Sequence, residues 1–243
     1  MKQHYVKTSN HHRFISGIRA VENRGSSEAC ILLLTGSPGT GKTTTVDNWG
    51  SETFAILIDG VPGMSLAFVR DYLARETNTY ARGKFAQHEA LVDFFQRSRY
   101  PIIFDEAQHG LPNKAECIEY LRRIAERAEV PLVLVCHTSE KHRFAEDRLA
   151  HIATRVSAVV ELKPASVEDC QSYLADLCEV QVDDAIAAQV HTQSSGRFRL
   201  MANAGRTLEA IAAKGGKTSL AVADVKGIRL CEDAMKSLQR GGK

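Results

Sequence analysis

The sequence predicts an α/β domain whose parallel sheet is sandwiched by helices, followed by a small all-helical lid. Three observations support this. Short apolar runs alternate with helical patterns over the first two thirds of the chain, the alternation stops near Pro164, and only helical patterns follow. We therefore expect a nucleotide-binding core with a short N-terminal helix at residues 1–164 and a helical subdomain at residues 165–243.

Five apolar runs rich in Val, Ile and Leu have the length of strands buried on both faces. These strands are Cys30–Thr35, Phe54–Ile58, Pro101–Phe104, Pro131–Cys136 and Ala158–Leu162. The helical patterns between them are Thr43–Trp49, Met64–Glu76, Ala86–Ser98, Lys114–Glu129 and His142–Ala153. The lid patterns are a run capped by Ser166 that reaches Cys178, then Asp183–Thr192, Phe198–Ala213 and Leu220–Leu238.

The composition is that of a soluble domain. The chain has 243 residues, of which 44% are apolar and 25% are charged, and both values are near the average. The longest apolar run, Ala29–Leu34, is far shorter than the ~18 residues that span a bilayer. We therefore expect a cytoplasmic protein with no membrane partner. Six cysteines form no CxxC pair, so we expect neither disulfides nor a structural metal.

The near-neutral net charge of +2 hides an asymmetry. Residues 1–30 carry +3, residues 31–195 carry −7 and residues 196–243 carry +6. Basic ends on an acidic centre indicate a polyanionic partner such as nucleic acid. Solvated helix faces are the alternative explanation of the same charges.

A phosphate-binding motif follows the first predicted strand. The segment Gly36–Thr43 reads GSPGTGKT and matches the P-loop pattern GxxxxGK(S/T). Its glycines let backbone N–H groups turn toward phosphates, and the helix that follows adds partial positive charge. We expect Lys42 to reach the β- and γ-phosphates and the Thr43 hydroxyl to bind Mg²⁺. The expected ATP-binding residues are Gly36, Ser37, Pro38, Gly39, Thr40, Gly41, Lys42, Thr43 and Thr44.

A second acidic motif ends the third predicted strand, where Phe104 is followed by Asp105 and Glu106. An apolar strand that ends in Asp-Glu is the Walker B pattern. We expect Asp105 to hold Mg²⁺ through water and Glu106 to polarise the attacking water. The pair favours ATP hydrolysis over phosphate transfer to another substrate, because a kinase must exclude water.

Two further polar positions are candidates for contact with the γ-phosphate. His137 and Thr138 follow the fourth predicted strand, and either one is expected to act as a sensor there. A capped turn into the next helix is the alternative explanation. Arg199 lies at the start of a lid helix, in Gly196-Arg-Phe-Arg, and is expected to point back at the nucleotide.

Three arginines precede or flank the fifth predicted strand. An arginine delivered from a neighbouring subunit neutralises the γ-phosphate in many NTPases and accelerates hydrolysis by ~10³–10⁵. A solvated helix face explains any single one of them equally well. The candidates are Arg143, Arg148 and Arg155.

These elements in this order resemble the AAA+ ATPases, over roughly Phe14–Leu238. That resemblance implies an ATP site between adjacent subunits and work done as an oligomer. Within AAA+, the chain most resembles the MuB/TnsC group, which selects target DNA for transposing phages and transposons. The small core, the run from Phe104 to His109 and the run from Val130 to His137 carry this resemblance. So does the region around Arg155. His137 stands where that group more usually has Asn.

The group resemblance implies a function on DNA. An ATP-bound helical filament or ring would coat duplex DNA with little sequence preference and present it to a transposase. Hydrolysis would then release it, in the cytoplasm of a bacterial host cell. Candidate DNA contacts follow the second predicted strand, where Gly83 separates two cations near Tyr80. They are Arg70, Arg82 and Lys84. An exposed loop between helices is the alternative explanation.

Other functions share the same nucleotide motifs. Another AAA+ machine, such as a replication-initiation or helicase-loading factor, is the first alternative, and a secretion ATPase of the ExeA type is the second. A small-molecule kinase is disfavoured by the Asp105-Glu106 pair and by the long helical tail.

Overall fold

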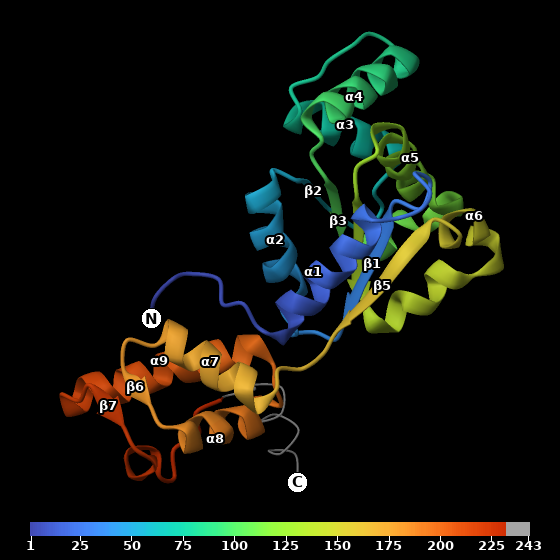
Figure 1. Ribbon diagram of the computed structural model, residues 1–243. Helices are drawn as coiled ribbons and strands as arrows, with labels where there is room; N and C mark the ends of the chain where they lie inside the picture. The colour runs from blue at the N-terminus through green and yellow to red at the C-terminus, as the bar shows by residue number, and fades with distance from the viewer. Residues whose placement is uncertain (232–243) are drawn as a thin grey trace. The chain divides into compact units, whose positions relative to one another are not determined.

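The structure is a computed structural model that describes residues 1–231. It divides into two compact units (Figure 1). The first unit comprises Arg13–Ser37 and Lys42–Leu162, and the second comprises Met1–His12, Pro38–Gly41 and the chain from Lys163 on. The second unit thus takes in the first twelve residues and the tip of the P-loop, which the sequence-based division had placed in the core.

The first unit is built on a parallel sheet of five strands in the order β2-β3-β4-β1-β5. The strands are β1 (Ile31–Gly36), β2 (Ile56–Asp59), β3 (Ile102–Asp105), β4 (Leu132–His137) and β5 (Val156–Leu162). In register, Gly36 pairs with His137 and Asp59 pairs with Asp105. All the strands point the same way, so the residues that follow them meet at one edge.

Helices cover both faces of this sheet, as predicted (Figure 1). Leu32 and Leu34 of β1 pack with α1 and α2, while Ile31 and Leu33 pack with the helices of the opposite face. This alternation is what a strand buried on both sides requires. The helices are α1 (Ser9–Glu22), α2 (Lys42–Thr53), α3 (Leu66–Glu76), α4 (Lys84–Ser98), α5 (Pro112–Ala128) and α6 (Ala150–Ala153).

One predicted helix of this unit, His142–Ala153, is wrong. The region forms two short 3₁₀ segments, η2 (Thr138–Ala145) and η3 (Asp147–Leu149), followed by the single turn of α6. Glu146 has an extended backbone (φ −64°, ψ 141°) and interrupts the helical path between them. A further 3₁₀ turn, η1 (Ala107–Gly110), joins β3 to α5.

The second unit is mostly helical, with α7 (Val167–Leu177), α8 (Asp184–Ser194) and α9 (Phe198–Gly215) around their own apolar core. Ser166 and Asp169 form a reciprocal capping box at the start of α7, which satisfies two backbone N–H groups. The unit also contains a short parallel ladder of β6 (Gln181–Val182) with β7 (Ser219–Leu220), followed by η4 (Val222–Val225).

The last predicted helix, Leu220–Leu238, is therefore wrong up to residue 231. Its remainder lies outside the described residues. All six cysteines are buried and free. No helix in residues 1–231 is long and apolar enough to cross a membrane.

Gly17 of α1 permits a close approach to the sheet. A Cβ at this position would lie 2.4 Å from Val160 Cγ2 and 2.8 Å from Leu32 Cδ1. We expect Gly17→Ala to lower the free energy of unfolding by ~1–3 kcal/mol through overpacking, despite alanine's better helix propensity. Urea unfolding followed by fluorescence of Trp49, the single tryptophan, measures it.

Gly25→Ala is the matched control, because nothing lies within 4 Å of a Cβ built there. It should leave the unfolding midpoint unchanged or raise it slightly. An unchanged midpoint in Gly17→Ala would contradict the tight packing of α1 on the sheet.

Candidate nucleotide site

The P-loop connects the end of β1 to the start of α2. Gly39 and Gly41 both have φ +84°, a left-handed conformation that residues with a Cβ rarely adopt. The spacing of glycines in the motif thus matches the backbone that the loop takes. The first helical residue is Lys42, so the N-terminal amides of α2 follow the loop directly, which suits an anion.

Lys42 folds over the first residues of the loop. Its Nζ donates to the carbonyl oxygens of Gly36 at 2.7 Å and Ser37 at 3.4 Å. Burial lowers the pKa of the Lys42 ammonium, and the carboxylates of Glu106 and Asp105 act against that shift. The ammonium is thus partly desolvated and lies near two acids.

Thr43 and Asp105 meet at the carboxyl edge of the sheet. The Thr43 hydroxyl donates to Asp105 Oδ2 at 2.8 Å, and the Glu106 N–H donates to Oδ1 at 2.8 Å. Burial raises the pKa of the Asp105 carboxyl, while the Thr43 and Glu106 hydrogen bonds oppose that shift. Asp59, in register with Asp105, adds a negative charge that favours the neutral form.

Glu106 follows β3 in a left-handed conformation (φ 48°, ψ 42°), which is uncommon for a residue with a side chain. Its Oε2 accepts a hydrogen bond from Gln108 Nε2 at 2.5 Å. The end of β2 presses on this turn, since a Cβ on Gly60 would lie 2.5 Å from Glu106 O. Sequence reasoning missed both residues. Gln108 lies two positions after Glu106, but no motif gave it a role, and only the tertiary structure places Gly60 beside Glu106.

His137 ends β4 directly beside the first residue of the P-loop. Its Nδ1 accepts the Ser139 N–H at 3.2 Å and lies 2.7 Å from the Ser139 hydroxyl. His137 Nε2 and Thr138 Oγ1 are buried and have no hydrogen-bond partner among residues 1–231. Both sensor candidates thus have an unused polar atom, and the choice between them stays open.

The candidate arginines each pair with an acid of the same unit. Arg143 binds Glu140 at 2.5 Å, Arg155 binds Glu28 at 2.6 Å, and Arg148 pairs with Glu146. The Arg155 carbonyl accepts from Ile31 N at the start of β1, whereas the P-loop begins at the other end of that strand. Five residues of strand span ~17 Å, so Arg155 lies at the opposite edge of the sheet from its own P-loop.

In the second unit, the tip of the P-loop packs against the start of α9. Phe198 N donates to Gly39 O at 2.9 Å, and a Cβ on Gly39 would lie 3.2 Å from Arg197 Cβ. Arg197 is therefore the lid arginine beside the loop, while Arg199 is exposed. The sequence pattern singled out Arg199, whose proposed contact with nucleotide stays a prediction.

Asn10 also fastens the loop tip within this unit, and sequence reasoning missed it. Its buried amide Nδ2 donates to Thr40 O at 3.1 Å and Lys163 O at 2.7 Å, and its Oδ1 accepts from Lys163 N at 3.1 Å. A single asparagine at a helix start carries no signal of such a role in the sequence.

The predicted DNA contacts lie around the connection between α3 and α4. Arg70, in α3, lies 3.5 Å from Asp71. Arg82 and Lys84 are exposed, and neither has an ion pair among residues 1–231. Two exposed aromatic side chains accompany them, Tyr80 (70% exposed) and Phe85 (79%).

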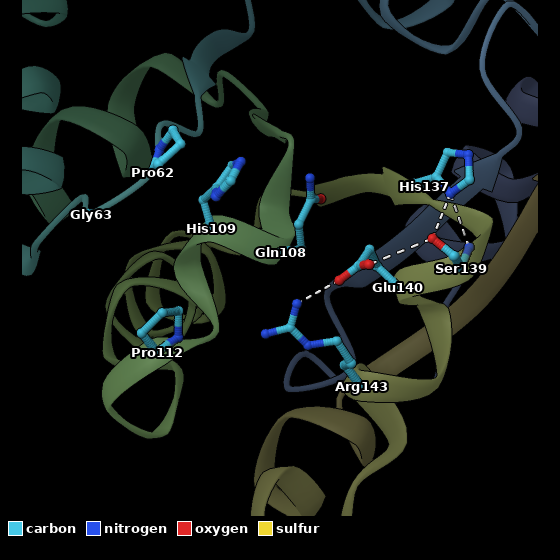
Figure 2. Close-up of a pocket in the computed structure, with 9 residues that line it drawn as sticks. All are labelled: Pro62, Gly63, Gln108, His109, Pro112, His137, Ser139, Glu140 and Arg143. Atoms are coloured by element: carbon cyan, nitrogen blue, oxygen red, sulfur yellow. Dashed lines mark hydrogen bonds and ion pairs between the residues drawn. The ribbon is translucent and has the colours of Figure 1, made fainter.

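A cavity of about 540 Å³ opens beside the Walker B turn (Figure 2). It is lined by the segments that follow three neighbouring strands, β2, β3 and β4. The lining residues are Pro62, Gly63, Gln108, His109, Pro112, His137, Ser139, Glu140 and Arg143. Side chains from the Walker B turn after β3 and from the end of β4, where His137 lies, thus line one cavity.

Comparisons with known proteins agree with this geometry. Residues 24–144 match the family model described as AAA domain. The Aeropyrum pernix ORC2 structure with ADPNP and ADP superposes with a TM-score of 0.68 at 18% identity, covering 93% of this chain and 69% of that one. The Thermotoga maritima RuvB Holliday junction branch migration motor gives 0.61 at 20% identity, covering 90% and 67%.

The Cdc6p structure from Pyrobaculum aerophilum gives a TM-score of 0.63 at 17% identity, covering 92% of this chain and 68% of that one. No curated protein gives a significant match. Nothing in these matches singles out the MuB/TnsC group. The AAA domain match and the structural similarities together establish that this chain has the fold of an AAA+ P-loop NTPase.

Proposed function

We propose that this protein is a Mg²⁺-dependent ATPase that assembles on duplex DNA, without sequence preference, and recruits or activates a transposase. The observation that carries the ATPase part is the 2.8 Å contact between Thr43 and Asp105 beside Lys42. Thr43 and Asp105, 62 residues apart in the sequence, bring a hydroxyl and a carboxylate together, and the Lys42 ammonium is close enough for the Asp105 charge to raise its pKa. The ORC2 structure, solved with ADPNP and ADP, supports a nucleotide there.

Magnesium fits the Thr43 and Asp105 oxygens. Mg²⁺ prefers hard oxygen ligands and keeps phosphate and water in much of its shell. No group of three or more His, Cys, Asp or Glu side chains suited to a metal occurs in the described part of the chain, so phosphate and water would complete the coordination. A bound Mg²⁺ would favour the ionised form of Asp105, whose pKa burial raises, and would supply charge neutralisation at the phosphates.

Glu106 would then serve as the base that orients the attacking water. Gln108 occupies only one oxygen of its carboxylate, which leaves the other to accept from water. Lys42 would exchange its carbonyl contacts with Gly36 and Ser37 for phosphate oxygens. His137 Nε2 or the Thr138 hydroxyl, neither of which has a partner within the described part of the chain, would donate to the γ-phosphate.

Assembly and DNA binding rest on different observations. Arg155 lies at the far end of β1 from its own P-loop, so it would act only on the nucleotide of a second copy. Exposed Arg82 and Lys84 are available to phosphates. RuvB, which shares the fold, is a Holliday junction branch migration motor. The transposase partner rests on the sequence resemblance alone.

A replication-initiation or helicase-loading role is the second candidate. The similarity of this chain to ORC2 and Cdc6p, over more than nine tenths of its length, favours it. Stimulation of a matched transposase would support the first candidate. A requirement for a helicase partner would support the second.

Glu106→Gln should slow ATP hydrolysis by at least ~10²-fold, because a positioned general base contributes ~10²–10⁴, while ATP binding is kept. Lys42→Ala should weaken ATP binding itself. Phosphate release and titration with a fluorescent ATP analogue separate the two effects. Glu116→Gln, a carboxylate on α5, is the control. Hydrolysis by Glu106→Gln at the normal rate would refute the catalytic assignment.

Arg155→Ala should reduce hydrolysis ~10³-fold in the assembled state. Mixing it with Glu106→Gln should restore part of the rate, because the second variant supplies an intact Arg155 to a competent site. Phosphate release across mixing ratios is the measurement, and Arg97→Ala, which removes an exposed arginine of α4, is the control. If Arg155→Ala hydrolyses ATP normally, Arg155 is not the arginine that acts on the neighbouring nucleotide. Arg148→Ala is then tested by the same mixing experiment.

DNA binding should require ATP and should be locked on in Glu106→Gln. The double variant Arg82→Ala/Lys84→Ala should reduce the salt slope of duplex binding by ~2, since each neutralised phosphate contributes ~0.9. Fluorescence anisotropy on two unrelated duplexes measures it, with Arg97→Ala as the matched control. If no binding occurs at low salt, the DNA role is excluded and the ATPase proposal is unaffected.

A further inference from the structure

Gln108 has one end of its amide engaged and the other end unused. Its Nε2 donates to Glu106 Oε2 at 2.5 Å. Its Oε1 is buried and has no hydrogen-bond partner among the described residues. Burying an amide oxygen without a donor is unfavourable, so this oxygen is suited to a donor that the present arrangement does not supply.

His137 is the complementary case. The backbone N–H of Ser139 can only donate, and it lies 3.2 Å from His137 Nδ1. Nδ1 must therefore accept, which places the proton of the neutral ring on Nε2. Nε2 is thus a donor, and it too is buried without a partner in residues 1–231.

Gln108 and His137, the residues that carry the unused acceptor and the unused donor, both line the same cavity. In the view of Figure 2, Gln108 is drawn between His109 and the His137–Ser139 pair. Gln108 follows β3 and His137 ends β4, and these strands are neighbours in the sheet. His137 is also in register with Gly36 of the P-loop.

We propose that Gln108 is a positioning residue that links His137 to Glu106 through an ordered hydrogen-bond chain. Ser139 N–H donates to His137 Nδ1, His137 Nε2–H donates to Gln108 Oε1, and Gln108 Nε2–H donates to Glu106. The first and last bonds are present in the structure. The middle one closes when nucleotide occupies the P-loop, and the Thr138 hydroxyl, which also lacks a partner among residues 1–231, is then the sensor that donates to the γ-phosphate. It fixes the Glu106 carboxylate with one oxygen directed at water, and this inference rests on the proposed ATPase function.

The test is a double-mutant cycle on hydrolysis with Gln108→Leu and His137→Phe, which keep side-chain bulk and remove the polar atoms. Each single variant should lower kcat about 10-fold, with the KM for ATP unchanged. The kcat of the double variant should be no lower than that of the less active single variant, because both substitutions break the same hydrogen-bond chain. Multiplying losses would overturn the proposal, as would a change confined to KM. His109→Ala, on the same cavity wall, is the control.

A second measurement does not depend on activity. Nitrogen-15 NMR of His-labelled protein should show His137 as the neutral Nε2–H tautomer. A non-hydrolysable ATP analogue should shift the Nε2–H signal in the unmodified protein and leave it unshifted in Gln108→Leu. An Nδ1–H tautomer, or the same shift in both, would overturn the chain. If the unmodified protein does not hydrolyse ATP, the ATPase proposal fails, and this NMR measurement alone decides whether the hydrogen-bond chain forms. If the unmodified protein hydrolyses ATP and Glu106→Gln does not, the ATPase proposal stands. Losses of Gln108→Leu and His137→Phe that multiply in the double variant would then refute only the hydrogen-bond chain.

Discussion

The parallel register of β1 with β4, and of β4 with β3, is the constraint on which the rest of the first unit depends. It aligns Gly36 with His137 and brings the Walker B turn alongside. Residues separated by tens of positions in the chain therefore end at one edge. A slip of one residue would turn the buried side chains of a strand to the opposite face. The apolar layers on both faces thus hold the polar edge in place.

Burial sets the electrostatics of that edge. It disfavours the charged forms of both Lys42 and Asp105. The carboxylates of Glu106 and Asp105 partly offset this for Lys42, and the hydrogen bonds from the Thr43 hydroxyl and the Glu106 N–H partly offset it for Asp105. Charges that are poorly solvated and incompletely paired interact strongly with an added ligand of the right sign. Phosphate would favour the charged lysine, and a divalent cation would favour the charged aspartate. Phosphate and a divalent cation bound together would therefore stabilise the charged forms of both Lys42 and Asp105.

Local patterns predicted the parts of the fold that local forces determine. The apolar runs located the five strands, and the glycine spacing located the P-loop, whose Gly39 and Gly41 need positive φ. The predicted helix at His142–Ala153 failed because the extended backbone at Glu146 overrides its periodicity. The contacts of Asn10 with Thr40 and Lys163 join distant parts of the chain. No pattern within a single segment reveals them.

The ion pairs of the candidate arginines do not count against a role in catalysis on a second copy. Arg155 is one-third exposed and Glu28 is about half exposed, and such pairs contribute only ~0–1 kcal/mol. An Arg–phosphate contact is charge-assisted and often bidentate, and in a water-excluded site it is stronger than the pair it replaces. The position of Arg155 at the far edge of the sheet therefore carries more weight than its present partner. By the same reasoning, Arg82 and Lys84, which have no ion pair to break among the residues that the structure describes, favour a polyanion at the α3–α4 connection.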